Sequence, residues 1–205
     1  LIVDDSTNNK IKKKISKYRN IKYFKRNNKS GRGSAVIFGM KHMIKEKKID
    51  VIVEMDTDLS SHPRELPKNI KFFKKEKLDL LIMSRYLPGS KIINWPLRRR
   101  IFSFFSNKLA NFLLKANVSD YTMGYRIYSK KAVIQIANNC GKVGSGFIVL
   151  SEILAELCYN NYKIKDTKTT FINREKGDST VGFKLIYESL IGIFKIYFKY
   201  RRIKI

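Results

Sequence analysis

Short apolar runs alternate with longer segments of helical spacing through the first part of this chain. Strand-like runs are predicted at residues 1–3, 21–24, 50–55 and 78–83, and DVIVEM at 50–55 is rich in β-branched side chains. Between them, the pattern predicts helices at residues 10–18, 34–45 and 63–75. Strands that alternate with helices favour a mostly parallel sheet with helices on both faces, so we predict an α/β fold.

The pattern changes after a Pro-Gly-Ser loop at residues 88–90, where aromatic side chains become frequent. Helices are predicted at residues 98–115, 147–159 and 184–200, and one further strand at 163–171. We expect residues 1–180 to form one domain and residues 181–205 to add a basic amphipathic helix.

Polar side chains follow directly after three of the predicted strands. Asp4 and Asp5 follow the first strand, Asp56 and Asp58 the third, and Arg85 the fourth. In parallel sheets, ligands bind at the carboxyl ends of the strands, so we expect these side chains to converge on one edge. Each residue alone is equally explained as a helix cap or turn residue, and their joint placement favours a binding site.

The pair Asp56 and Asp58 is the sharpest chemical signal in the sequence. Two carboxylates at positions i and i+2 after a strand can face one hard cation. Oxygen ligands favour Mg²⁺ or Mn²⁺, which in turn bridge phosphate oxygens. Glu54 adds a third acid, which makes a local acidic island in a basic chain. The alternative is that these carboxylates bind lysine side chains instead of a metal.

The charge balance points to an anionic partner without naming it. Lys plus Arg total 43 against 17 for Asp plus Glu, so the formal net charge is +26. Such a chain should associate with polyanions such as nucleic acid, anionic lipid or phosphorylated substrates. Because the aromatic residues do not form a stacking platform interleaved with basic residues, we do not expect nucleic acid to be the partner.

Several ordered motifs extend over residues 1 to about 180. They are VDD at 3–5, KSGRGSA at 29–35, EMDTDLSSHP at 54–63, SRY at 84–86, WPLRRR at 95–100, DYTMGYR at 120–126 and FINR at 171–174. In order and spacing they are similar to VDDGS, K-x-G-L-G-T-A, MDADLSHHP, SRY, W-x-x-x-R-x, D-x-T-x-G-F-R and F-x-x-R. The chain therefore resembles the dolichol-phosphate mannosyltransferases, which are GT-A glycosyltransferases of family 2.

The resemblance implies a GT-A, Rossmann-like fold and transfer of mannose from GDP-mannose to a dolichyl or polyprenyl phosphate, with inversion at the sugar carbon. It implies that Mg²⁺ or Mn²⁺ is held on the donor diphosphate by Asp56 and Asp58, with Ser60 as a side ligand. Catalysis would involve Asp58 and the arginines that the family places on phosphates, which are Arg85, Arg99 and Arg174. Donor contacts would include Asp4, Asp5, Lys29 and Gly33.

The motif at residues 120–126 is implied to form an acceptor loop, with Asp120, Thr122 and Arg126 as its marked residues. Arg126 could equally pair with Asp120 and hold the loop in shape. These two readings of Arg126 both remain open from the sequence.

The chain also departs from the family pattern. It begins inside what the resemblance makes the second strand, so we expect the first strand and its P-x-Y-N-E segment to be missing. Because that segment forms part of the nucleoside pocket in relatives, two alternatives stay open. One is a polyprenyl-phosphate glucosyltransferase that uses UDP-glucose, and the other is an inactive family member that acts as a binding protein.

A lipid-linked acceptor requires that the protein reach a membrane surface, and the pattern of the C-terminal helix indicates such a contact. Polar residues form a narrow stripe on an otherwise apolar, aromatic helix, which is typical of helices that lie in a membrane interface. The basic residues expected to meet anionic head groups are Lys195, Lys199, Arg201 and Arg202. We expect a peripheral protein on the cytoplasmic face, with a small membrane subunit as a further partner. The alternative is a helix that packs on the sheet or on a partner subunit.

Overall fold

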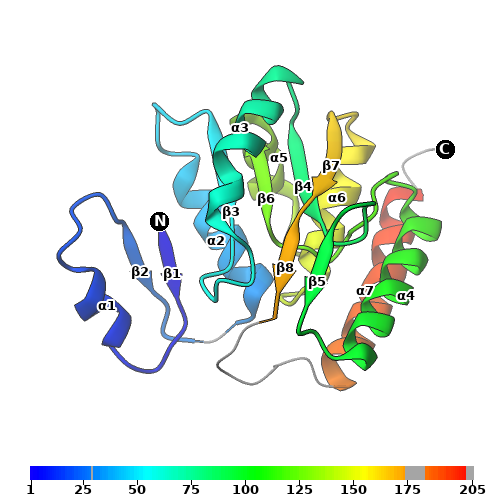
Figure 1. The fold of residues 1–205 in the computed structure, drawn as a ribbon, viewed down its shortest axis with the longest axis horizontal. Helices are drawn as coiled ribbons and strands as arrows, with labels where there is room; N and C mark the ends of the chain where they lie inside the picture. The colour runs from blue at the N-terminus through cyan, green and yellow to red at the C-terminus, as the bar shows by residue number, and fades with distance from the viewer. Residues whose placement is uncertain (29, 174–182, 202–205) are drawn as a thin grey trace.

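The computed structural model describes residues 1–28, 30–173 and 183–201, and Figure 1 shows its elements. Its strands are β1 (Ile2–Asp4), β2 (Tyr23–Lys25), β3 (Val51–Glu54), β4 (Leu80–Ser84), β5 (Lys91–Ile93), β6 (Arg126–Ser129), β7 (Ile164–Lys168) and β8 (Thr170–Ile172). Its helices are α1 (Lys10–Ile15), α2 (Arg32–Met43), η1 (Pro63–Glu65), α3 (Leu66–Lys75), α4 (Leu97–Leu114), α5 (Lys130–Asn139), α6 (Ile148–Tyr159) and α7 (Phe183–Arg201). The predicted α/β class is confirmed, while β5, β6 and α5 were not predicted.

The central sheet has the strand order β3-β6-β4-β7. β4 pairs in parallel with β7, whereas β6 runs antiparallel to both of its neighbours, β3 and β4. All five residues of β4 are buried, as expected for a strand covered on both faces. The sheet is therefore mixed, because the short β6 runs antiparallel to its neighbours. It also separates β3 from β4.

Two smaller parallel pairs flank this sheet. β1 pairs with β2, and β5 pairs with β8. The strand predicted at residues 163–171 is divided at Thr169, so that β7 belongs to the central sheet and β8 to the pair with β5. Thr169 is buried, and its hydroxyl donates to Glu65. This division brings β8 to the loop after β3, where Ile172 N donates to Ser60 O at 3.0 Å.

The helices pack in a continuous series beside the sheet. α2, α5 and α6 contact one another, and α7 contacts both α6 and α4. Figure 1 shows α4 and α7 side by side at one end of the molecule. α7 adds Ile193 and Ile196 to the hydrophobic core, so the C-terminal helix is part of this domain as well as a candidate surface helix.

Candidate functional site

The N-terminal end of α2 and the end of β3 meet through Arg32. Its Nη1 lies 2.9 Å from Glu54 Oε1, and its Nε donates to Asp56 Oδ1 at 2.9 Å. Burial alone would lower the pKa of Arg32, but the charges of Glu54 and Asp56 outweigh burial and the pKa is raised. The acidic island therefore binds a cationic side chain, as the alternative reading expected, but the cation is an arginine rather than a lysine.

The second aspartate of the pair lies in the exposed loop that follows β3. Asp58 Oδ1 accepts a hydrogen bond from Ser60 N at 3.0 Å. Leu59 between them has a φ of 60°, which makes the turn tight. Ser60 is buried, and its carbonyl is held by β8 as described above. The loop is thus anchored at Ser60 and presents the carboxylate of Asp58 to solvent.

The donor chemistry of these side chains decides whether they can hold a metal ion. Among the described residues, no group of three or more His, Cys, Asp and Glu side chains is gathered closely enough to hold a metal ion. Asp56 and Asp58 are both exposed and carry the oxygen donors that Mg²⁺ and Mn²⁺ prefer. Since Mg²⁺ is usually held by one or two carboxylates plus substrate phosphates, the pair fits such an ion only together with a phosphate ligand.

Asp4 and Asp5 lie at the end of β1 and hold the chain locally. Asp4 is buried and accepts from Ser6 N at 2.8 Å and from the Tyr23 hydroxyl at 2.7 Å. Burial would raise the pKa of Asp4, but these hydrogen bonds outweigh burial and the pKa is lowered. Asp5 forms a bidentate pair with Arg26. Their predicted donor contacts stay a prediction.

Two further predicted donor residues are Lys29, which precedes α2, and Gly33, in the first turn of α2. Lys29 lies outside the described residues. Gly33 is packed so closely against the N-terminal end of α6 and the residues before it that an added Cβ would lie 2.4 Å from both Gly146 O and Val149 Cγ2. The absence of a side chain at Gly33 is thus explained by this close approach of α2 to residues 146–149, and its donor contact stays a prediction.

The end of β4 carries a buried ion pair. Arg85 Nε donates to Asp120 Oδ2 at 2.8 Å, and Nη2 donates to Asp120 Oδ1 at 2.9 Å and to Thr122 Oγ1 at 2.6 Å. Asp120 is 0% exposed and Arg85 is 8% exposed. The structure therefore brings the predicted phosphate residue Arg85 together with two marked residues of the predicted acceptor loop.

Arg126 has a different role from the one that the ion-pair reading gave it. It is fully buried and donates to three backbone carbonyls, those of Met123, Tyr121 and Leu150. Asp120 is paired with Arg85, so the expected pair between Arg126 and Asp120 is not formed. Arg126 instead holds the loop in shape through its backbone, and its guanidinium is turned away from solvent.

Aromatic rings surround the guanidinium of Arg85. Its Cζ lies 4.9 Å from the Trp95 ring centroid and 5.5 Å from that of Phe171. The Cζ of Arg99 lies 5.7 Å from the same Trp95 centroid. The sequence analysis did not identify Trp95 or Phe171 as site residues, although both fall inside the quoted motifs. Arg174, which follows this segment, lies outside the described residues.

A pocket of about 370 Å³ opens beside Arg85. Arg85 and Arg100 supply its cationic groups, while most of its wall is apolar. The other lining residues are Tyr86, Leu87, Ser90, Ile92, Leu97, Ile101, Phe104 and Phe105. A pocket with guanidinium groups and an aromatic wall suits an anionic group that is attached to a hydrocarbon chain.

The helix α7 packs against α6, and Gly192 and Lys199 of its polar stripe lie on the α6 side. Gly192 allows this approach, because an added Cβ would lie 2.4 Å from Ile148 Cγ1. Lys199 lies 3.5 Å from the fully buried Glu152, so one of the four predicted membrane lysines and arginines serves an internal ion pair. Lys195 and Arg201 are exposed, and Arg202 lies outside the described residues.

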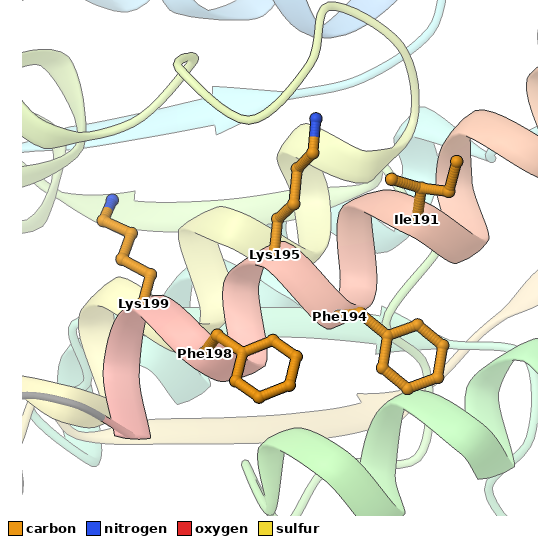
Figure 2. A pocket seen from close by; sticks show the side chains of 5 residues that line it. All are labelled: Ile191, Phe194, Lys195, Phe198 and Lys199. Carbon is orange, nitrogen blue, oxygen red and sulfur yellow. The ribbon is translucent and has the colours of Figure 1, made fainter.

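α7 also exposes apolar groups. Ile191, Phe194 and Phe198 are 38%, 47% and 51% exposed. Figure 2 shows Phe194 and Phe198 on the side toward α4, with Lys195 and Lys199 pointing the other way. α4 also carries exposed apolar residues, which are Leu97, Ile101, Phe102, Phe104, Phe105 and Phe112. No helix in the described ranges has the length and apolarity to cross a membrane.

An α/β fold whose strand ends bring arginines and carboxylates together is typical of enzymes that bind nucleotide diphosphates. The model of the family described as "Glycosyl transferase family 2" matches residues 1–137. The chain therefore belongs to glycosyl transferase family 2.

Three curated relatives share similar identity with this chain. They are an undecaprenyl-phosphate mannosyltransferase of Micrococcus luteus (31% identity over 82% of this chain), a polyprenol monophosphomannose synthase of Mycolicibacterium smegmatis (30% over 82%) and a dolichol-phosphate mannosyltransferase of Pyrococcus furiosus (32% over 96%). The matches cover 68%, 62% and 54% of the lengths of those proteins.

Solved structures support the fold. Glucosyl-3-phosphoglycerate synthase from Mycobacterium tuberculosis in complex with uridine-diphosphate is similar with a TM-score of 0.63 and 13% identity, over 95% of this chain and 67% of that one. The same enzyme in complex with phosphoglyceric acid gives a TM-score of 0.58. At this identity the likeness establishes the GT-A type of fold and nothing about the substrate.

Proposed function

We propose that this chain transfers a mannosyl group from GDP-mannose to a polyprenyl phosphate in a reaction that depends on a divalent cation. The pocket beside Arg85 is the observation that carries the proposal, since it joins guanidinium groups to an aromatic wall. The names of the three curated relatives support the same acceptor class. The donor and the metal rest on the motif resemblance and on the exposed carboxylates of Asp56 and Asp58.

The residues suit a reaction in which the nucleophile is a phosphate oxygen. A lipid phosphate with a second pKa of about 6 is mostly dianionic at neutral pH, so a strong general base is not needed. Alignment of the acceptor and neutralisation of phosphate charge become the main requirements. Asp120 and Thr122 hold Nε and Nη2 of Arg85, which fixes the position of this guanidinium beside the pocket, where it would serve as a phosphate ligand.

Asp56 and Asp58 would hold Mg²⁺ or Mn²⁺, with Ser60 beside them in the anchored loop. When bound, the cation neutralises the departing diphosphate as a Lewis acid. Arg85 and Arg99 are distant in sequence, but in space both guanidinium groups contact the Trp95 ring. Two guanidinium groups around one indole therefore supply positive charge at the end of β4.

The donor and acceptor can be tested by a transfer assay with radiolabelled sugar nucleotides and a polyprenyl phosphate in detergent. We expect label from GDP-mannose in the lipid extract with Mn²⁺ or Mg²⁺, and at least tenfold less after chelation with EDTA. UDP-glucose is the matched control donor. Transfer from UDP-glucose alone would favour the glucosyltransferase alternative, and transfer that is unchanged by EDTA would exclude the proposed role of the metal.

We further propose that the apolar surface of α4 and α7 lies on the membrane that carries the acceptor. Replacing both Phe194 and Phe198 with Ser should reduce sedimentation with anionic liposomes by at least about tenfold, because each exposed ring that enters the interface contributes on the order of 1 kcal/mol or more. Lys199 is left intact in this variant, since it pairs with Glu152.

The control for the liposome experiment is Tyr18→Ser, which removes a ring that is 50% exposed and lies near α1. This variant should bind liposomes like the unchanged chain. Equal binding by the Phe194→Ser/Phe198→Ser variant would mean that α7 does not contact the membrane. A large loss of thermal stability in that variant would show instead that the two rings are needed for packing against α4.

A further inference from the structure

Every nitrogen of the Arg32 guanidinium has a partner at the candidate metal site. Nε donates to Asp56 Oδ1 at 2.9 Å, Nη1 lies 2.9 Å from Glu54 Oε1, and Nη2 donates to Gly124 O at 3.4 Å. The Phe147 ring covers the same group, with its centroid 5.7 Å from Cζ. This positive charge is therefore held in one place, directly on the first aspartate of the pair.

The arrangement opposes the binding of a free metal ion. A divalent cation on Asp56 would have to share the carboxylate with Arg32 and would lie next to a fixed positive charge. Asp58 alone is then a single exposed carboxylate, which is too few protein ligands for a hard cation. A nucleotide diphosphate changes this balance, because it adds oxygen ligands and negative charge at the same place.

We propose that Arg32 is a positioning residue that withholds Asp56 from free divalent cations and thereby makes metal binding depend on the nucleotide diphosphate. The inference rests on the proposed function, since it assumes that Asp56 and Asp58 are the metal ligands. It goes further by assigning the coupling between metal and donor to one arginine of α2. By linkage, the same residue sets how much the metal strengthens nucleotide binding.

Gly124 offers a way to test the position of this guanidinium without removing its charge. An added Cβ at Gly124 would lie 1.9 Å from Arg32 Nη2 and 2.6 Å from Cζ, so the guanidinium must move. The backbone of Gly124 is not in the left-handed region, so Ala is compatible with its conformation. Gly124→Ala should therefore displace Arg32 from Asp56 while the net charge stays the same.

The experiment is a calorimetric titration with Mn²⁺, first on the chain alone and then in the presence of saturating GDP. We expect Arg32→Leu to bind Mn²⁺ about tenfold more tightly than the unchanged chain without GDP, and Gly124→Ala to change in the same direction. The factor by which GDP strengthens Mn²⁺ binding should fall in both variants. Leu is the residue at this position in the family motif quoted for residues 29–35, so that motif accommodates the substitution.

Two controls separate this inference from the proposed function. Lys41→Leu removes one exposed charge from the same helix and should leave Mn²⁺ binding unchanged. Asp56→Asn should weaken Mn²⁺ binding in the presence of GDP. If Asp56→Asn weakens binding but neither Arg32→Leu nor Gly124→Ala tightens it, the role of Arg32 is wrong and the metal site stands. If Asp56→Asn has no effect or no form binds Mn²⁺ with GDP, the metal site and this inference both fail.

Folding of the variants is checked by circular dichroism before titration. If Arg32→Leu does not fold, because Glu54 is left without its cation, Gly124→Ala decides the question. Tighter Mn²⁺ binding by folded Gly124→Ala supports the proposal, and unchanged binding overturns it.

Discussion

Replacing Arg85 with Ala is expected to lower the free energy of unfolding by about 3–5 kcal/mol, because it leaves a buried carboxylate without its cation. Asp120 is 0% exposed and receives two hydrogen bonds from the guanidinium, at 2.8 and 2.9 Å. Urea denaturation at neutral pH measures the loss directly. The matched control is Arg100→Ala, which removes an exposed arginine from the same pocket and should change stability by less than about 0.5 kcal/mol.

A double substitution tests whether the unpaired charge is the cause. The variant Arg85→Ala/Asp120→Ala should be more stable than Arg85→Ala alone, because no buried charge is left without a partner. If the double variant is as unstable as the sum of the two single ones, the loss comes from packing around Arg85 instead. Transfer activity should be lost in all variants that lack Arg85.

The same pair gives stability a defined dependence on pH. Burial would raise the pKa of Asp120, but the charge and hydrogen bonds of Arg85 outweigh burial, and the pKa lies below its ordinary value of 3.8. A carboxyl group with a depressed pKa stabilises the fold fully above its unfolded pKa, and this contribution is lost as the pH falls through the folded pKa. The stability advantage over Asp120→Asn should therefore be constant above about pH 4 to 5 and shrink below it.

Replacing Asp58 with Asn is expected to weaken Mn²⁺-dependent binding of GDP by about a hundredfold or more, which corresponds to about 2.7 kcal/mol. Asp58 is exposed, and the hydrogen bond from Ser60 N can also be accepted by the Asn side-chain carbonyl. The fold should therefore be preserved while the negative charge is lost. Calorimetric titration of GDP with and without Mn²⁺ separates the metal-dependent part of the affinity.

The control for this loss is Asp50→Asn, an exposed aspartate just before the opposite end of β3. It removes the same charge at the opposite end of β3, away from the site, so GDP binding should not change. Unchanged GDP affinity of Asp58→Asn in Mn²⁺ would place the metal site elsewhere. Weaker GDP binding without Mn²⁺ in that variant would show that Asp58 acts on the nucleotide without the metal.

The local elements of this fold could be predicted from the sequence because they depend on local patterns. The β-branched run at β3 and the apolar run at β4 were predicted within two residues, as were α4 and α6. The short β6 could not be predicted, since its four residues carry too little pattern to indicate a strand. Its antiparallel insertion between β3 and β4 depends on pairing between segments more than 40 residues apart in sequence.

The candidate site shows the same division. The sequence motifs singled out Asp56, Asp58, Arg85 and Asp120, because each follows a strand or lies in a quoted motif. They did not indicate that Arg85 pairs with Asp120 or that Arg32 holds Asp56, because an ion pair depends on which loops the sheet brings together. For the same reason, Arg126 was open to two interpretations until the structure paired Asp120 with Arg85 and showed Arg126 donating to backbone carbonyls.

The sequence by itself determined the α/β class, the family resemblance and the kinds of residue available for phosphate and metal chemistry. These properties depend on local periodicity and on ordered motifs, and neither depends on contacts between distant parts of the chain. The tertiary structure decided which charges neutralise each other and which side of α7 is exposed. Lys199 illustrates the reason, since the helical pattern marked it as polar but only the packing of α7 on α6 placed it against the buried Glu152.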